Sequence, residues 1–325
     1  MGTTVNTAVV STGPLKFLEK VRIVAAAGVA VVLMTTIGWM AVSPADPDMA
    51  VSYTTGGRAI WTAWPVMLAL TVVASLLGTV IAGPRLPESG LLAASVGLVA
   101  LAIRGGSMQA VLGYHAGTEE ATRKALMVNM EIDALLWAAI LVASWKAVSM
   151  VWRWLWVEQE GEAGEGSGVP SGKGPRKASG VANGGRLRAA WPGWAVTAVL
   201  GLFIIWVTVA RTPVATVARG QVIASVAGGL FLAAMAARYF TGVDDVRGYL
   251  LAPLIVALVG YLLGYLQADM SWTREGSGAY ALLATTPPHA LARPLPLEYV
   301  AGGLVGSIVG YWSGGKVELV AEQEL

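Results

Sequence analysis

The sequence predicts an all-α, polytopic integral membrane bundle of about eight transmembrane helices, arranged as two parallel four-helix repeats. Of the 325 residues, 55% are hydrophobic and only 13% are charged, which is too little charge to cover the surface of a soluble domain of this length. Apolar runs near or above 18 residues recur along the chain, and runs of that length cross a bilayer as helices. One long polar stretch, residues 157–190, separates two apolar blocks.

The composition also excludes several kinds of site. Because cysteine is absent, the chain has no disulfide, no thiolate-bound zinc or iron–sulfur cluster and no thiol nucleophile. Its two histidines, His115 and His289, are too few to favour a metal centre built on imidazole. A net charge of +2 does not indicate nucleic-acid binding. We therefore predict no metal, no cofactor and no nucleic-acid partner.

The first block, residues 1–156, is predicted to cross the membrane four times. Lys16, Lys20 and Arg22 precede the first apolar run, and positive residues beside a span favour the cytoplasmic side. A cleavable signal peptide is the alternative, but about 20 apolar residues exceed a usual signal core, and Ser43–Pro44 is a poor cleavage site. We therefore expect a cytoplasmic N-terminus and spans over residues 23–42, 61–82, from 89 onwards, and 132–151.

The third span is short for a membrane helix. Only about 15 residues separate Ser89 from Ile103, too few to cross a hydrocarbon core of about 30 Å. Either the span continues through Arg104-Gly105-Gly106 to about Leu112, or a short helix is followed by a re-entrant segment. In both cases Arg104 lies at or below the interface, and the glycine pair loosens the helix after it.

The linker and the second block complete the predicted topology. Residues 157–190 are rich in Gly, Ser and charge and cannot build a core, so we predict a flexible cytoplasmic linker. Residues 191–325 are predicted to cross the membrane four more times and to end in a short tail, with spans over 194–210, 221–240, 249–267 and 298–312. With eight spans, both termini are expected in the cytoplasm. The expected location is the cell membrane, either an inner membrane or a plasma membrane. One basic turn, 211–219, falls on the outer side and opposes the positive-inside rule.

The two blocks resemble each other in sequence. A tryptophan and a proline near the end of the first span (IGWMAVSP, 37–44) recur near the end of the fifth (IIWVTVARTP, 204–213). Glu131 and Trp145 in the fourth span have the same separation as Glu298 and Trp312 in the eighth. Since Trp, Glu and Pro are the rarer letters in such segments, this favours duplication over chance similarity. An even number of spans per repeat makes the repeats parallel.

Charged residues at the ends of spans are the candidate substrate-binding residues. Arg104 ends the short part of the third span, Glu131 and Asp133 open the fourth, and both ends face outward. An ion pair between Arg104 and Glu131 or Asp133 is geometrically plausible. A pair that only anchors two helices at the interface is the bland interpretation, and it is slightly favoured because interfacial Arg and Glu are common and exposed pairs contribute little. The second repeat keeps Glu298 at the position of Glu131 but has Leu263 near that of Arg104. The site is therefore expected to be built unevenly from the two repeats.

Glycines at a spacing of four mark the last two spans. They are Gly260 and Gly264 in the seventh span and Gly302, Gly306 and Gly310 in the eighth. Small residues at this spacing allow membrane helices to approach closely, so we interpret them as helix-packing positions of core helices that are candidates to pack on each other.

His115 and His289 lie in corresponding outer loops of the two repeats. A cofactor held by two imidazoles is one interpretation, but both residues lie outside the predicted spans and lack a ligand-like helical setting. We therefore interpret them as exposed loop histidines. The chain also lacks HExxH, Gly-x-Ser-x-Gly and a phosphate loop in a strand–helix context, so no catalytic residue is assigned, and a membrane enzyme is the third choice.

Two function classes are preferred over a membrane enzyme. The first is a small-solute or ion carrier with a site between the repeats, near the four charged residues. The alternative is a non-catalytic structural or assembly subunit of a membrane protein complex, favoured by few polar groups and abundant small residues. The expected partners are the lipid bilayer and, as candidates, other membrane proteins or further copies of the chain. The surroundings of Arg104 discriminate between the classes, because a carrier should expose it to a water-filled cavity between the repeats and a subunit should pair it at the surface.

Overall fold

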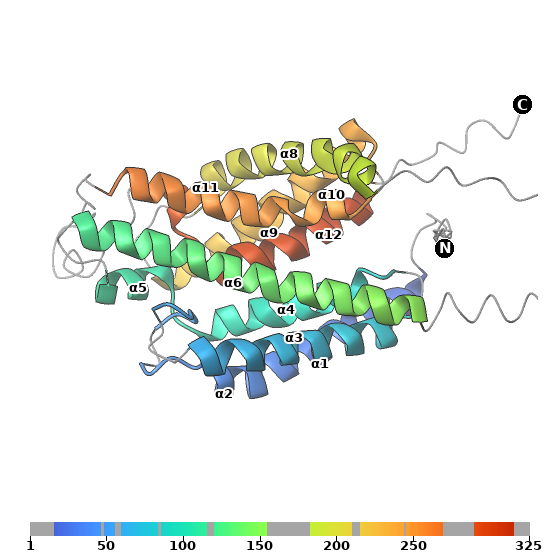
Figure 1. The fold of residues 1–325 in the computed structure, drawn as a ribbon, viewed down its shortest axis with the longest axis horizontal. Coiled ribbons are helices and arrows are strands. Elements are labelled where there is room, and N and C mark those ends of the chain that lie inside the picture. The colour runs from blue at the N-terminus through green and yellow to red at the C-terminus, as the bar shows by residue number, and fades with distance from the viewer. Residues whose placement is uncertain are drawn as a thin grey trace, which may run out of the picture.

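A computed structural model of the chain describes residues 16–46, 49–55, 60–83, 86–115, 120–154, 183–209, 215–243, 245–268 and 289–314. Within these ranges every regular element is a helix and none is a strand. The helices run side by side along the longest axis of the molecule (Figure 1). The all-α prediction is confirmed for this part of the chain.

Six helical segments within the described ranges are long and apolar enough to cross a bilayer, with mean hydropathies of 1.6 to 2.2. The first is Phe17–Val42, which comprises α1 (Phe17–Leu33), the π-helical turn η1 (Met34–Gly38) and α2 (Trp39–Val42). The others are α3 (Ile60–Ala82), α6 (Glu120–Trp152), most of α8 (Asn183–Thr208), most of α9 (Ala215–Thr241), and α10 (Arg247–Leu250) with α11 (Ala252–Leu266).

The outer faces of these helices are apolar. Trp61 on α3 is 87% exposed and Phe240 on α9 is 75% exposed, and many Val, Leu and Ile side chains on the same faces are exposed as well. Apolar surface spread over several long helices is typical of contact with lipid rather than water. The protein is therefore a multi-pass membrane protein.

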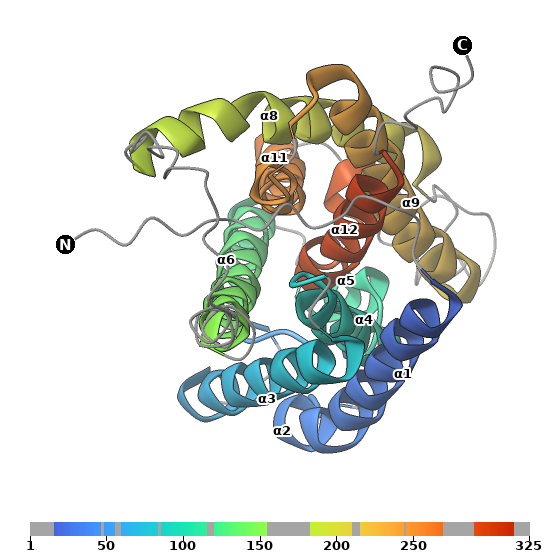
Figure 2. The same ribbon diagram turned by 90° about the vertical axis from the view of Figure 1, so that its right-hand side faces the viewer.

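Two shorter helices occupy the middle of the bundle. They are α4 (Ser89–Arg104) and α12 (Gly303–Ser313), which continues the π-helical turn η5 (Glu298–Gly302). Figure 2 shows both enclosed by the longer helices. The 16 residues of α4 extend about 24 Å at ~1.5 Å per residue, less than a hydrocarbon core of about 30 Å. A helix can be this short when protein, not lipid, covers its ends.

The packing around α4 is close on two sides. A Cβ added at Gly97 would lie 2.7 Å from the carbonyl oxygen of Ala30 on α1, and one at Gly90 would lie 2.2 Å from that of Ser75 on α3. Neither position has room for a larger residue, so the backbones of α1 and α3 rest directly on α4.

The structure distinguishes between the two predictions for the third span. The helix ends at Arg104, and after a break a separate helix, α5, covers Met108–His115. The span therefore does not continue as one helix to Leu112. The sequence of residues 117–120 is typical of a helix start that can run straight into the fourth span, and α6 does begin at Glu120 and includes that span. One boundary differs from the prediction, because α8 begins at Asn183, inside the predicted linker. The rest of that linker lies outside the described residues.

The described part of the chain begins and ends at one end of the bundle. In Figure 1, α1 begins, α6 ends, α8 begins and α12 ends at the right-hand end. This is the arrangement expected if both termini and the linker share one side of the membrane. That this side is the cytoplasm stays a prediction.

Candidate functional site

Three irregular segments meet around the opposite ends of the central helices. They are residues 49–55 before α3, the break 105–107 after α4, and residues 289–297 before η5, which include the 3₁₀ turn η4 (Ala290–Ala292). Their apolar side chains are buried, with Ala50, Val51, Ala292 and Leu295 among them. Irregular backbone inside a membrane bundle must be enclosed by protein or line a polar cavity, because its N–H and C=O groups need partners. We call these three segments, with Asp133, Arg219 and Glu298, the polar layer.

Asp133 binds the first of these segments. Its carboxylate on α6 is fully buried and accepts hydrogen bonds from the Tyr53 backbone N–H at 3.0 Å and 3.2 Å and from the Thr54 N–H at 3.1 Å. The Thr54 hydroxyl also donates to the Asn129 carbonyl oxygen at 3.2 Å. Hydrogen bonds to a buried carboxylate are strong, so segment 49–55 is fastened to α6.

The same segment also contacts the break after α4. The Gly106 N–H donates to the Met49 carbonyl oxygen at 2.8 Å. A Cβ added at Gly105 would lie 2.9 Å from Cγ2 and 3.1 Å from the backbone N of Val51. A larger residue at position 105 would separate the two segments.

Arg219 joins the end of α4 to the second block. From α9, its guanidinium donates to the carbonyl oxygens of Ala102 and Gly105. Its Nε lies 3.9 Å from Oε1 of Glu298. The carbonyls at a helix C-terminus carry a partial negative charge, so one guanidinium balances both that charge and the carboxylate.

Glu298 begins η5 and is only 3% exposed. Its Oε2 accepts a hydrogen bond from the Leu295 N–H at 2.8 Å. Two tyrosine hydroxyls hold the segment before it, since Tyr299 donates to the Leu291 carbonyl oxygen and Tyr261 to that of Pro294, each at 2.7 Å. Segment 289–297 is thereby fixed to both η5 and α11.

Two polar groups near Asp133 lack partners. Tyr53 and Trp137 are buried with their ring centroids 4.6 Å apart. Neither the Tyr53 hydroxyl nor the Trp137 Nε1–H has a hydrogen-bond partner among the described residues. Buried polar groups are normally satisfied, so these two groups are exceptions within the described part of the polar layer.

The predicted ion pair of Arg104 is wrong. The Arg104 side chain is exposed, donates to the Thr35 carbonyl oxygen in η1, and lies with its Cζ 4.7 Å from the Trp39 ring centroid. Among the described residues it forms no ion pair with Glu131 or Asp133. The reason is direction: the Arg104 side chain reaches η1 and α2, whereas Asp133 faces segment 49–55.

Glu131 lies apart from the polar layer. It is partly exposed on α6 and forms no hydrogen bond or ion pair within the described part of the chain. Residues two apart on a helix point in nearly opposite directions, so Glu131 and Asp133 cannot share a partner. Of the four predicted substrate-binding residues, the structure thus brings Asp133 and Glu298 into one layer and leaves Arg104 and Glu131 outside it.

Sequence reasoning missed Arg219. It assigned the arginine to an outer turn because the sixth span was drawn from residue 221, whereas the span begins at Arg219. The signal was available, since a basic residue predicted to lie on the outer side opposes the positive-inside rule and requires another reason for its position.

The predicted helix-packing glycines lie at close contacts, with one exception. An added Cβ would lie 2.1 Å from the Ala227 carbonyl oxygen at Gly306 and 2.2 Å from that of Phe231 at Gly310, so these two bring α12 close to α9. At Gly260 it would lie 2.4 Å from the Leu291 carbonyl oxygen, and at Gly264 2.7 Å from Sδ of Met127. At Gly302 the nearest atom is 3.8 Å away, an ordinary contact. The closest approaches are therefore not between α11 and α12, and their effect on assembly stays a prediction.

His289 caps η4. Its Nδ1 accepts a hydrogen bond from the Leu291 N–H at 3.2 Å, and burial lowers the pKa of its imidazole. His115 is the last residue of α5, and its side chain lies outside the described residues. Among the residues that the structure describes, no three His, Asp or Glu side chains gather as a metal site would require.

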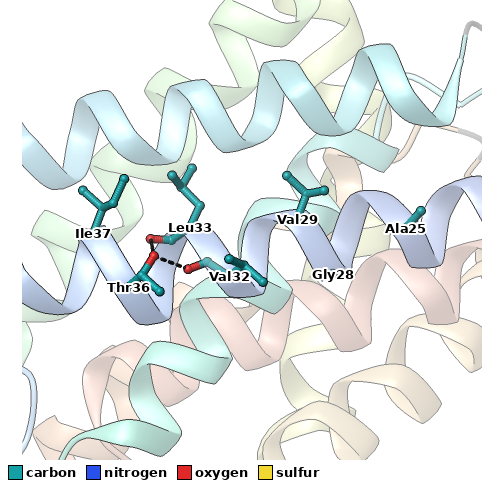
Figure 3. A pocket seen from close by; sticks show the side chains of 7 residues that line it. All are labelled: Ala25, Gly28, Val29, Val32, Leu33, Thr36 and Ile37. Carbon is teal, nitrogen blue, oxygen red and sulfur yellow. Dashed lines mark hydrogen bonds between the residues drawn. The ribbon is translucent and has the colours of Figure 1, made fainter.

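An apolar groove lies on the outer face of the first span (Figure 3). It is lined by one helical stripe of α1 and η1: Ala25, Gly28, Val29, Val32, Leu33, Thr36 and Ile37. The Thr36 hydroxyl is the polar side-chain group of the stripe, and it donates to the Val32 carbonyl oxygen at 2.6 Å. A groove of this chemistry suits lipid chains or an apolar helix.

Comparisons of the chain with protein-family models, with curated proteins and with solved structures find no match. The function is therefore argued from the polar layer. Its chemistry is that of charge held inside a membrane bundle: two carboxylates, one guanidinium and the carbonyls of a helix that ends inside the protein.

Proposed function

We propose that the protein is a carrier for a small solute or ion and that its binding site is the polar layer. The observation that carries the proposal is the end of the central helix α4, which stops inside the bundle and has its last carbonyls covered by Arg219 from the other block. Discontinuous helices whose ends face charged groups are typical binding sites of membrane transporters. Buried ionisable residues in a membrane bundle also favour a functional role.

We further propose eight spans in two parallel repeats, with α4 and η5–α12 as the third and eighth. The packing across the blocks supports this, because α4 contacts η5 and α12, while α6 contacts α11. The third span of the first block (α4) thus packs on the fourth span of the second block (η5–α12). The third span of the second block (α10–α11) packs through α11 on the fourth span of the first block (α6). An axis along the membrane normal that relates the repeats would exchange these two contacts.

The proposal predicts which acidic residues are required for transport. The protein is reconstituted into liposomes, and currents on solid-supported membranes are recorded for a panel of alkali cations, amino acids and amines. For the solute that gives a current, Glu298→Gln and Asp133→Asn should reduce it at least tenfold. Glu131→Gln is the matched control and should leave it within twofold, because Glu131 lies outside the layer. The opposite ranking would show that the polar layer is not the site.

A non-catalytic subunit of a membrane complex is the second candidate, and the position of Arg104 favours it. Arg104 is exposed and has partners within its own block, the arrangement expected of a subunit. A carrier is expected to have a charged arginine between the two blocks, and Arg219 rather than Arg104 lies there. For this reason we prefer the carrier. A partner protein that co-purifies in mild detergent at a fixed ratio, together with no current for any solute of the panel, would favour the subunit.

A further inference from the structure

The oxygens around Arg219 form a set that a metal cation could use. Two are the carbonyl oxygens of Ala102 and Gly105 at the end of α4, and the third is Oε1 of Glu298. Ala102, Gly105 and Glu298 are all buried. They come from both blocks of the chain, and hard cations prefer such oxygen ligands.

The electrostatics of this place favour a positive charge for two independent reasons. The carbonyls at the end of α4 lack partners within the helix, and the helix dipole places partial negative charge there. Glu298 adds a carboxylate. In transporters with discontinuous helices, carbonyls at such helix ends coordinate the coupling cations.

The hold of Arg219 on this set is incomplete. Its Nε lies 3.9 Å from Oε1 of Glu298, beyond hydrogen-bond distance, and Nε has no hydrogen-bond partner among the described residues. Oε2 of Glu298 accepts the Leu295 N–H, whereas Oε1 is the oxygen nearer Arg219. Oε1 is therefore the carboxylate ligand of the set. The Arg219 side chain is 18% exposed, whereas Glu298 is only 3% exposed.

We infer that these oxygens are a binding site for a small monovalent metal cation, such as Na⁺ or K⁺, which the Arg219 guanidinium fills as a tethered cation. The inference rests on the proposed carrier function and names its substrate class. Exchange of the guanidinium for a metal ion leaves the net charge of the polar layer unchanged. Because uncompensated charge in a membrane bundle is costly, this exchange avoids the main penalty of moving an ion through the layer.

The test removes the tethered cation and asks whether a free one replaces it. Arg219→Ala is purified in detergent, and its thermal unfolding midpoint is measured in NaCl, KCl and N-methyl-D-glucamine chloride at equal ionic strength. The large organic cation cannot enter the set, so the variant should melt at least about 2 °C higher in NaCl or KCl. Arg104→Ala, which removes an arginine at the same helix end but outside the set, should respond equally to the three salts. Arg219→Ala with Glu298→Gln should lose the response.

Arg219→Gln provides a second variant, because it removes the charge but keeps a polar amide donor at this position. It should gain the same preference for Na⁺ or K⁺. Equal midpoints in the three salts for both variants would overturn the inference. Failure to purify either variant in NaCl or KCl would overturn it too, since no free cation would then replace the guanidinium. A cation response without currents in liposomes would support the cation site and argue against the carrier function. Currents without a cation response would support the carrier function and argue against the cation site.

Discussion

Replacing Asp133 by alanine tests whether this carboxylate holds segment 49–55 in place. The substitution removes the acceptor of two backbone N–H groups, on the buried Tyr53 and the partly buried Thr54. An unsatisfied buried donor costs about 1–3 kcal/mol. Because Thr54 can regain water more easily than Tyr53, we expect a loss of about 2–4 kcal/mol in the free energy of unfolding. That loss corresponds to a fall of roughly 3–6 °C in the unfolding midpoint.

The assay combines stability with local access. Thermal unfolding in detergent gives the midpoint, and Glu131→Ala is the control, expected within about 0.5 kcal/mol of the parent because it removes a partly exposed side chain. The absence of native cysteine allows a single cysteine at the buried Val51, whose rate of reaction with a maleimide reports release of the segment. Asp133→Ala should increase that rate at least tenfold. Equal midpoints for the two alanine variants, with equal labelling rates, would refute the idea that Asp133 fastens the segment.

Three further predictions concern packing, pH and orientation. Gly306→Leu should destabilise the protein by more than about 2 kcal/mol, because its Cβ alone would lie 2.1 Å from the Ala227 carbonyl oxygen; Gly302→Ala, with ordinary contacts, should change stability by less than about 0.5 kcal/mol, and equal losses would argue against tight α12–α9 packing. The pKa of His289 is lowered by burial, so the folded state disfavours the charged imidazole, and the unfolding midpoint should fall as the pH decreases below about 6.5. In His289→Gln this part of the pH dependence should disappear, and an unchanged profile would assign it to another group. A cysteine at Ser171 should react with an impermeant maleimide in inside-out vesicles and not in intact cells, and labelling of intact cells would reverse the predicted orientation.

The parts of the fold that the sequence predicted are those with a local signal. A run of apolar residues is enough to place a span, and the six long helices were found for that reason. The end of the third span was left open between two alternatives, because α4 stops where distant parts of the chain cover its end, such as Val51 against Gly105. The π-helical turns η1 and η5 also have no pattern that distinguishes them from α-helix.

The candidate site was predicted in part for the same reason. Asp133 and Glu298 were named because acids near spans are rare. However, Asp133 binds the backbone of Tyr53 and Glu298 lies beside Arg219, each of them about 80 residues away in the sequence. One error was avoidable: the helical period alone separates Glu131 from Asp133, so only one of them could face the polar layer. The sequence does not show that Arg219 rather than Arg104 lies between the two blocks, because this depends on how α9 packs beside α4.

The enclosure of α4 changes which substitutions this helix tolerates. A span that contacts acyl chains must stay apolar but can vary in side-chain size, whereas α4 is covered by protein and already contains the buried Ser89 and Ser95. Its Gly90 and Gly97 face the backbones of α3 and α1 at distances that admit no added atom. Volume rather than hydrophobicity therefore limits its sequence, and serine should replace alanine along α4 more readily than leucine does.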